Sequence, residues 1–342
     1  MIEKPADFYK NIVKNNDILN MLLLEIVLLF LLLKLFFYSS IYKFIKKNGH
    51  GLNRLIKPNH IYQEDCIAFM QRMREENVFV DIIVTSPPYN INKEYVSYKD
   101  NKGRNDYLDW LQNVAETSYF ILKENGSFFL NIAGRPTDPM LPFLVVDRFK
   151  GNEKRIYNLQ NTIHWIKSFT IEQEDIGKNN GFRGTSIGHF KPIVSERYLT
   201  DIHEYIFHFT KTGSVKIDKM GIGVKYQDKT NIGRWKSATE DRRDRGNVWF
   251  IPYLTIQEER PHPAVFPVKL PELCIKLHGR KDGLLVYDPF MGIGSTALAC
   301  KRLGVKYIGT EIDGGYIKIA KEQISGKIEE YLQGDEDDLV QL

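Results

Sequence analysis

The chain has 342 residues, of which 43% are hydrophobic and 26% charged, a composition that excludes a disordered protein and suffices for one large domain or two smaller ones. Its formal net charge is only +4, so a polyanion must be bound by a local basic surface rather than by the chain as a whole. The three cysteines, Cys66, Cys274 and Cys300, share no short spacing, which excludes a disulfide framework and a cysteine-rich zinc site and favours a reducing compartment.

A hydrophobic stretch lies near the N-terminus, from Met21 to Tyr38, and is apolar at all but two of its 18 positions. A helix of this length rises about 27 Å, close to the thickness of a bilayer core. The two charged residues, Glu25 and Lys34, lie toward opposite ends, where long side chains reach the interface and the cost of burial falls. The stretch therefore predicts a transmembrane helix over 21–38, whose free energy of membrane insertion is favourable by a small margin.

Basic residues follow this hydrophobic stretch. Residues 39–60 carry five Lys or Arg and no acid, whereas the first twenty residues carry three Lys. The positive-inside rule then places the large C-terminal part in the cytoplasm, anchored to the membrane through 21–38. Hydropathy does not distinguish such an anchor from a leader without function, so both interpretations stay open, and in the second the protein is simply cytoplasmic. A cleaved signal peptide is disfavoured, because the apolar run is long and no A-x-A-like site follows it.

From Ile61 onward, short apolar runs alternate with amphipathic stretches, which predicts an α/β fold with a mostly parallel sheet. We expect seven strands, at Ile61–Gln63, Val80–Thr85, Gly126–Ile132, Ile163–Lys167, Glu204–Thr210, Leu284–Tyr287 and Tyr307–Thr310. We expect helices at Cys66–Glu76, Tyr107–Lys123, Pro267–His278, Ser295–Leu303 and Gly314–Ser325.

Two polar stretches, 171–200 and 213–261, interrupt this alternation. From Lys211 to Arg260 there are 11 Lys or Arg against seven Asp or Glu, a local surplus equal to that of the whole chain. We interpret this region as a substrate-facing insert, with a solvated loop region as the alternative. The chain then divides into a leader and basic linker (1–58), a catalytic half (59–210), an insert (211–261), a cofactor half (262–328) and an acidic tail (329–342).

A glycine-containing turn follows the strand expected at 284–287. The pattern Gly292-x-Gly294-x-x-Ala297 lies between that strand and a helix, where glycine permits positive φ and lets the backbone approach a ligand. The next strand ends at Glu311, nineteen residues after Gly292, so its carboxylate is placed to accept hydrogen bonds from ribose hydroxyls. The carboxylate of Asp288 would repel a pyrophosphate and attract a cation, which disfavours a dinucleotide and favours S-adenosyl-L-methionine.

A second motif, Ser86-Pro87-Pro88-Tyr89, directly follows the strand expected at 80–85. The proline pair stiffens the end of the strand and offers carbonyl acceptors without N–H donors. An exocyclic amino group of a nucleobase could donate its two hydrogens to the Ser86 hydroxyl and the Pro87 carbonyl, while Tyr89 stacks on the base. A rigid surface turn is the alternative interpretation.

Together, Thr85–Asn90 and Asp288–Thr296 resemble the paired signature motifs of the amino-group DNA methyltransferases, which modify cytosine N4 or adenine N6. The catalytic motif comes first, as in the circularly permuted β group of that family. The resemblance covers roughly residues 59–325 and implies a permuted, Rossmann-like methyltransferase sheet with helices on both faces. It also implies cofactor contacts from Glu64-Asp65-Cys66 and from Phe266 within His262–Pro267, and a stacking role for Phe190. In the cofactor motif the implied binding residues are Asp288, Pro289, Phe290, Gly292, Gly294, Ser295, Thr296 and Glu311.

The resemblance implies direct methyl transfer from S-adenosyl-L-methionine to an exocyclic amine, with no metal and no covalent enzyme intermediate. No cysteine follows the Pro-Pro motif, so the cysteine route to carbon-5 methylation is unsupported. Members with Ser at the position of Ser86 usually act on cytosine N4, which we prefer, and adenine N6 stays open. A base buried in a duplex must be flipped out to react.

The expected partner is double-stranded DNA, read as a short specific sequence. Basic residues of the insert are candidates for phosphate and guanine contacts, with ordinary surface charge as the alternative: these are Arg234, Lys236, Arg242, Arg243 and Arg245. The resemblance further implies a restriction-modification system, in which a separate endonuclease cuts the same site. Rival interpretations are an RNA or small-molecule methyltransferase and a membrane-tethered DNA-binding protein without catalysis. The sequence leaves the oligomeric state open.

Overall fold

The computed structural model describes residues 55–90, 100–150, 156–176, 183–188, 192–234, 240–252 and 265–327. The hydrophobic stretch at 21–38 and the acidic tail lie outside these residues. The chain divides into two compact units, Met1–Leu55 and Ile56–Leu342, and the second holds all the described helices and strands. No helix within the described ranges is long and apolar enough to cross a membrane.

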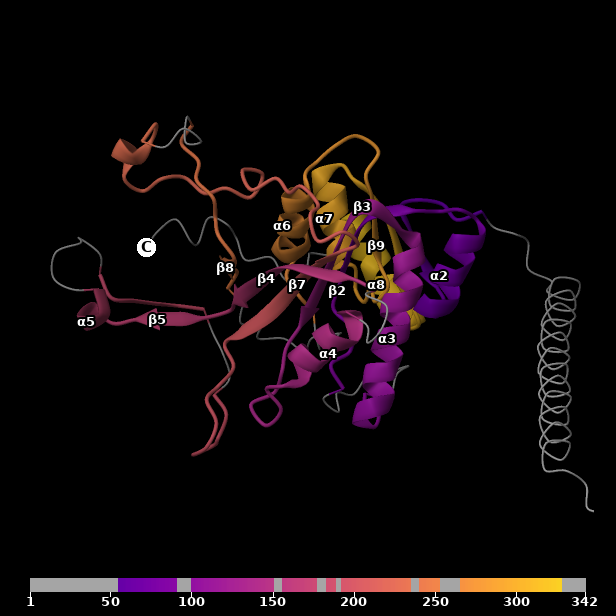
Figure 1. Cartoon of the computed structure of the whole chain (residues 1–342), viewed down its shortest axis with the longest axis horizontal. Coiled ribbons are helices and arrows are strands. Elements are labelled where there is room, and N and C mark those ends of the chain that lie inside the picture. Colours follow the sequence, from indigo (N-terminus) through magenta and orange to yellow (C-terminus); the bar gives the residue numbers. More distant parts are fainter. Residues whose placement is uncertain are drawn as a thin grey trace, which may run out of the picture. The chain divides into compact units, whose positions relative to one another are not determined.

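An eight-stranded sheet forms the centre of this unit, with strand order β1-β10-β9-β2-β3-β7-β4-β8. Figure 1 shows the part of this sheet from β9 to β8. The strands are β1 (His60–Gln63), β2 (Val80–Thr85), β3 (Leu122–Ile132), β4 (Asn158–Ile166), β7 (His203–Thr210), β8 (Val248–Phe250), β9 (Leu285–Asp288) and β10 (Lys306–Glu311). All neighbours pair in parallel except β7, which is antiparallel to both β3 and β4. The sheet is therefore mostly parallel, as the sequence predicts.

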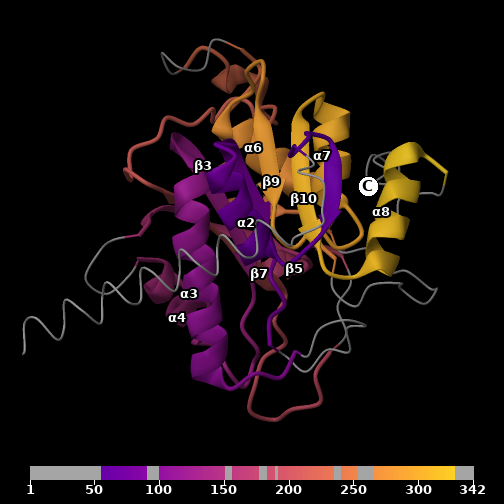
Figure 2. The ribbon, with the colours of Figure 1, turned by 90° about the vertical axis from the view of Figure 1, so that its right-hand side faces the viewer.

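Helices cover both faces of the sheet (Figure 2). On β2, Ile82 and Val84 belong to one buried cluster with residues of α6 (Lys269–His278), α7 (Ser295–Leu303) and α8 (Gly314–Ser325). Val80 and Ile83 belong to a second cluster with residues of α2 (Cys66–Glu75), α3 (Arg104–Ile121) and α4 (Leu141–Lys150). Because successive strand residues point to opposite faces, a strand buried on both sides is apolar almost throughout, which explains the sequence of β2.

The described sheet has eight strands rather than the seven expected, because the insert supplies β8. This three-residue strand pairs in parallel with β4, and Trp249 within it is fully buried. The strand is too short for its alternation to stand out in a polar segment. Helix α4 was also not predicted, nor were the hairpin of β5 (Phe169–Ile171) and β6 (Thr185–Ile187) and the short helices α5 (Gln173–Ile176) and η1 (Lys229–Asn231).

Candidate active site

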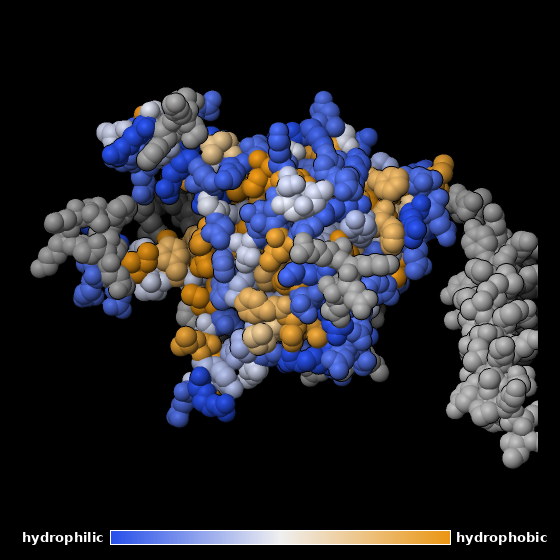
Figure 3. Space-filling view, in the orientation of Figure 1, coloured by the Kyte–Doolittle hydropathy of each residue, from blue (hydrophilic) through white to orange (hydrophobic). Residues whose placement is uncertain are grey.

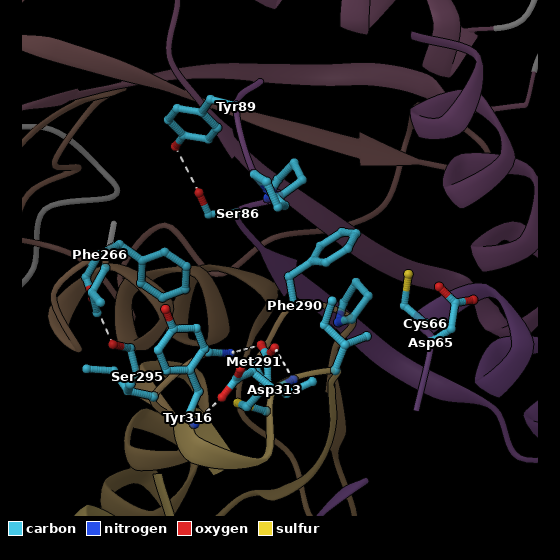
Figure 4. Close-up of a pocket in the computed structure, with 18 of the residues that line it drawn as sticks. Asp65, Cys66, Ser86, Tyr89, Phe266, Phe290, Met291, Ser295, Asp313 and Tyr316 are labelled. Carbon is cyan, nitrogen blue, oxygen red and sulfur yellow. Dashed lines mark hydrogen bonds between the residues drawn. The ribbon is translucent and has the colours of Figure 1, made fainter. Parts of the chain in front are cut away.

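A cavity of about 270 Å³ lies at the carboxyl ends of the parallel strands, where open α/β sheets bind ligands (Figure 4). It is lined by residues that follow β2, β9 and β10, together with the start of α2. Pro88 of the Pro-Pro motif and Gly292 of the glycine turn both belong to its wall. The fold therefore brings the two sequence motifs to one cavity.

The glycine turn is held by the strand beside it. Gly292 has φ of 53° and donates its N–H to Glu311 Oε2 at 2.9 Å, while Met291 donates its N–H to the carbonyl of Thr310. Gly294 has φ of 97°, and a Cβ there would lie 3.0 Å from Cβ of Ala320 on α8. The backbone angle thus favours glycine at both positions, and close packing against α8 adds a second reason at Gly294.

Asp288 does not line this cavity, in contrast to the expectation that its carboxylate attracts a cationic ligand. It is 1% exposed, and its oxygens accept hydrogen bonds from Thr85 Oγ1 (2.7 Å), Thr296 Oγ1 (2.5 Å) and the N–H of Phe290 (3.0 Å). Burial raises its pKa to about 6. Asp288 is the last residue of β9, and the turn begins directly after it. Its hydrogen bonds therefore hold the turn in place from the buried side.

Other carboxylates face the cavity instead. Glu64, Asp65, Glu311 and Asp313 all line it, whereas Lys102 is the only Lys or Arg among its described lining residues. Asp65 and Asp313 cap the N-termini of α2 and α8, so each side chain is held in place by backbone N–H groups. Burial raises the pKa of Glu311. This excess of acids suits a ligand with hydroxyl donors and positive charge, and it disfavours a phosphorylated one.

Apolar side chains complete the wall. Phe266, Pro289, Phe290 and Cys66 line it as expected. Ser295 Oγ donates to the carbonyl of Phe266 at 2.8 Å, which fastens the segment before α6 to the first residue of α7. Further lining residues were not singled out from the sequence. Met291 and Ile293 flank Gly292 within the glycine turn, whereas Trp110, Ile312 and Tyr316 lie outside the two motifs.

A second, larger cavity of about 780 Å³ adjoins the first. Four residues belong to the walls of both cavities: Ser86, Tyr89, Val265 and Phe266. The second cavity is lined further by residues after β3 and β4, and by the segment 193–204. The catalytic motif therefore lies where the two cavities meet.

Hydrogen bonds hold the Pro-Pro motif rigidly. Tyr107 Oη on α3 donates to the carbonyl of Pro88 at 2.7 Å, and a guanidinium nitrogen of Arg135 donates to the carbonyl of Asn90. The Pro87 carbonyl accepts none of the hydrogen bonds that the described residues make. Ser86 Oγ donates to Tyr89 Oη at 2.8 Å (Figure 4), and Tyr89 Oη donates to Glu204 Oε2 at 2.8 Å.

Not every predicted site residue reaches a cavity. Like Asp288, Gly294 and Thr296 shape the turn without lining the first cavity. Phe190 and Lys236 lie outside the described residues. Glu204, which lines the second cavity, was seen in the sequence only as part of a strand, although a lone carboxylate beside the apolar run Tyr205–Phe207 is a signal that could have found it.

The basic residues of the insert differ in their surroundings. Arg245 Nε donates to the carbonyl of Ile222 at 2.9 Å, and Arg242 donates to the carbonyl of Gly223 at 3.1 Å, so both hold the insert's own backbone. Arg234 and Arg243 are exposed. Hydrophilic side chains gather on the projecting part of the insert that carries η1 (Figure 3).

The comparisons with known proteins agree with this geometry. Residues 80–322 match the N6_N4_Mtase family, described as DNA methylase, and the chain belongs to this family. It is a DNA amino-methyltransferase, and its cofactor is S-adenosyl-L-methionine, whose sulfonium, amino and ribose hydroxyl groups suit the acid-lined cavity.

Among its relatives, the type II methyltransferase M.BglII of Bacillus subtilis is 28% identical over 286 residues, which cover 80% of this chain and 70% of the relative. The type II methyltransferase M.SmaI of Serratia marcescens is 28% identical, over 71% of this chain and 84% of the relative. Among solved structures, the cytosine-N4-specific PvuII DNA methyltransferase has a TM-score of 0.54 at 19% identity and covers 81% of this chain and 91% of its own. This last likeness concerns the fold.

Proposed function

We propose that the chain methylates N4 of a cytosine that is flipped out of a short, specific sequence of double-stranded DNA. The observation that carries this proposal is the position of Ser86 and Tyr89, which belong to the walls of both cavities. An amine that enters from the second cavity would meet them beside the first, where the cofactor fits.

We assign the first cavity to the cofactor. Glu311 would accept hydrogen bonds from the ribose hydroxyls, and the carboxylates of Asp65 and Asp313 add negative charge around a cationic ligand. Cys66, Phe266, Pro289 and Phe290 would pack against its apolar parts, and the backbone at Gly292 and Ser295 would approach it closely. When bound, the cofactor supplies a methyl group activated by positively charged sulfur.

We assign the amine to Ser86 and the Pro87 carbonyl. The Ser86 hydroxyl already donates to Tyr89, so its lone pairs remain for an N–H donor. The Pro87 carbonyl is not used by the described residues. Two acceptors on the amine withdraw its hydrogens from the plane of the base and free the nitrogen lone pair for attack. Tyr107 and Arg135 donate hydrogen bonds to the carbonyls of Pro88 and Asn90 and so fix the backbone that carries this acceptor pair.

The second cavity is the proposed place of the flipped base. Its volume of about 780 Å³ is ample for a nucleobase, and its polar lining includes Asn131, Lys167 and Glu204. Tyr89 is the described stacking candidate, and Phe190 remains a prediction. The preference for cytosine depends on Ser86 in the catalytic motif. Adenine N6 is the second candidate, because one relative, YhdJ of Escherichia coli, is a DNA adenine methyltransferase with 25% identity over 77% of this chain and 82% of its own.

We further propose that the insert binds DNA, with Arg234 and Arg243 against phosphates. The names of the relatives support a type II restriction-modification system, in which a separate endonuclease acts on the same sequence. The proposed place of action is the cytoplasm. Membrane association through 21–38 stays a prediction, since this stretch lies outside the described residues.

The test is methylation of unmodified genomic DNA by the full chain with labelled cofactor, followed by mass spectrometry of the nucleosides and mapping of the modified site. We expect N4-methylcytosine within one short sequence. N6-methyladenine would select the second candidate. Label found only in RNA, or no transfer despite DNA binding, would overturn the proposal in favour of an RNA methyltransferase or a non-catalytic DNA-binding protein.

A further inference from the structure

Glu204 is a buried carboxylate in the wall of the second cavity. It is 8% exposed and belongs to β7, whose next five residues are partly or fully buried. Its oxygens accept hydrogen bonds from Tyr89 Oη at 2.8 Å and Asn131 Nδ2 at 2.9 Å, and Lys167 Nζ lies 2.5 Å away. Three parts of the chain therefore supply partners to one carboxylate, as a buried charge requires.

These contacts fix the direction of the neighbouring hydroxyls. An ionised carboxylate only accepts, so the Tyr89 hydroxyl must donate to Glu204. The Tyr89 oxygen is then free to accept, and the hydroxyl of Ser86 donates to it at 2.8 Å. Both hydroxyl hydrogens consequently point along one path, from Ser86 through Tyr89 to Glu204.

We infer that Glu204 is a positioning residue for methyl transfer and the final acceptor of the proton that the amine releases, an inference that rests on the proposed function. An amine that gains a methyl group must lose one proton. That proton moves to Ser86 Oγ, the Ser86 proton moves to Tyr89 Oη, and the Tyr89 proton moves to Glu204. One N–H and two O–H bonds break, three O–H bonds form, and Glu204 becomes a neutral acid.

The surroundings suit this path. Burial, and next the charge of Glu204, raise the pKa of Tyr89, so its hydroxyl passes a proton on without becoming a stable phenolate. Lys167 faces Glu204 from the end of β4 and Asn131 faces it from β3. The other charged or titratable groups that line the same cavity, besides Tyr89, are Arg135, Tyr198, Asp201 and His203. After the turnover, Glu204 can return its proton to water through this second cavity.

The test uses the full chain and the duplex whose modified site has been mapped. Glu204→Gln keeps the size and an acceptor for Tyr89 but cannot take up the proton, and Tyr89→Phe removes the middle of the path. For each variant we expect single-turnover methylation to slow by about 100-fold, as for loss of a general base, with unchanged cofactor affinity. The double variant should be no slower than the slower single variant, because both changes interrupt one path.

The pH profile separates this role from a structural one. The wild-type rate should decline toward acid pH, as for any step that needs a general base, and this decline should vanish in Glu204→Gln. Glu272→Gln is the matched control, because Glu272 is a 7% exposed carboxylate that pairs with Arg302 at 3.2 Å and lines neither cavity. A wild-type rate in Tyr89→Phe, or additive losses in the double variant, would overturn the inference while leaving the proposed function intact. A wild-type chain that methylates no DNA would instead remove the proposed function.

Discussion

The hydroxyl of Thr85 donates a 2.7 Å hydrogen bond to the carboxylate of Asp288, and this bond joins the last residue of β2 to the last residue of β9. The two residues are 203 positions apart in sequence, yet their strands are neighbours in the sheet. Ser86 directly follows Thr85, and the glycine turn directly follows Asp288. One buried hydrogen bond therefore sets the catalytic motif against the cofactor motif.

Replacing Thr85 with Val removes this bond and keeps the shape of the side chain. Asp288 then loses one of its three hydrogen bonds, and we expect the free energy of unfolding to fall by about 1–3 kcal/mol at pH 8. The folded pKa of Asp288, about 6, lies above its ordinary 3.8, so the contribution of this group to stability is fully favourable below pH 3.8 and is lost as the pH rises through 6. At pH 5 most of the folded Asp288 is therefore neutral, and a neutral carboxyl group accepts a weaker hydrogen bond than a charged one. Replacing Thr85 should hence lower the free energy of unfolding less at pH 5 than at pH 8.

Urea unfolding of wild type and Thr85→Val at the two pH values measures this difference. Thr137→Val, at an exposed threonine between β3 and α4, is the control and should change stability little at either pH. An equal loss at pH 5 and pH 8 would show that the Asp288 charge plays no part.

Ser86→Ala tests the proposed acceptor role. The cofactor cavity keeps its other lining residues, so we expect cofactor affinity within about twofold of wild type. Turnover should fall by about 100-fold or more, because one of two fixed acceptors for the amine is lost. Calorimetric titration of the cofactor and single-turnover methylation measure the two effects separately. Full turnover in this variant would exclude the role.

A buried hydrogen-bonded chain links β4, β7, β3 and α6. Asn161 Nδ2 lies 2.9 Å from His208 Nδ1, and Ser127 Oγ lies 3.0 Å from His208 Nε2 and 2.9 Å from His278 Nδ1. Burial lowers the pKa of His208 to about 3 and that of His278 to about 4. Both rings are therefore neutral in the folded protein at neutral pH.

His208→Gln should reduce the acid sensitivity of the fold. The folded pKa of His208 lies below its ordinary 6.5, so the unfolded chain binds more protons between pH 6.5 and 3, and stability falls as the pH drops through that window. Between pH 7 and pH 4, this one group should lower the free energy of unfolding of the wild type by about 3 kcal/mol. The variant should not show this decrease. Urea unfolding at both pH values measures it, with the exposed His60→Gln as control. Parallel pH dependence of the two proteins would contradict the assignment.

Arg243→Ala tests the insert as a DNA-binding surface. Arg243 is exposed, so its loss should weaken binding to all duplexes and reduce the slope of log affinity against log salt by about 1. Fluorescence anisotropy with a labelled duplex at several salt concentrations measures the slope. Arg148→Ala is the control, since Arg148 pairs with Asp109 at 2.9 Å on the helical surface of α3 and α4. An unchanged slope would remove Arg243 from the interface.

Much of the fold could be predicted because the strands are short apolar runs between clear turns. The seven expected strands and five expected helices all occur among the described residues, since buried parallel strands and amphipathic helices carry strong local patterns. Strand β8 and helix α4 were missed. Strand β8 lies within a polar segment and depends on pairing with β4, which no local pattern shows.

The site was predictable to the extent that its residues belong to motifs. Ser86 and Gly292 lie in contiguous signatures, and the fold brings them to one cavity. Asp288 was placed in contact with the ligand because the sequence shows its position at the end of a strand but not the Thr85 and Thr296 hydroxyls that occupy its oxygens. Glu204 and Lys167 meet only because β7 and β4 pair, so their role had to wait for the three-dimensional arrangement.

The pairing of β1 with β10 has a consequence for biosynthesis. His60 lies opposite Ile308, so β1, the first strand of the described sheet to be synthesised, can pair only after β10, the last strand of that sheet, has been made. Until then Ile61 and the neighbouring strand edges have no partner, and folding is dominated by contacts distant in sequence, which slows it and favours help from chaperones. A premature stop before β10 would leave no partner for β1, and the nascent product would be inert and prone to aggregate.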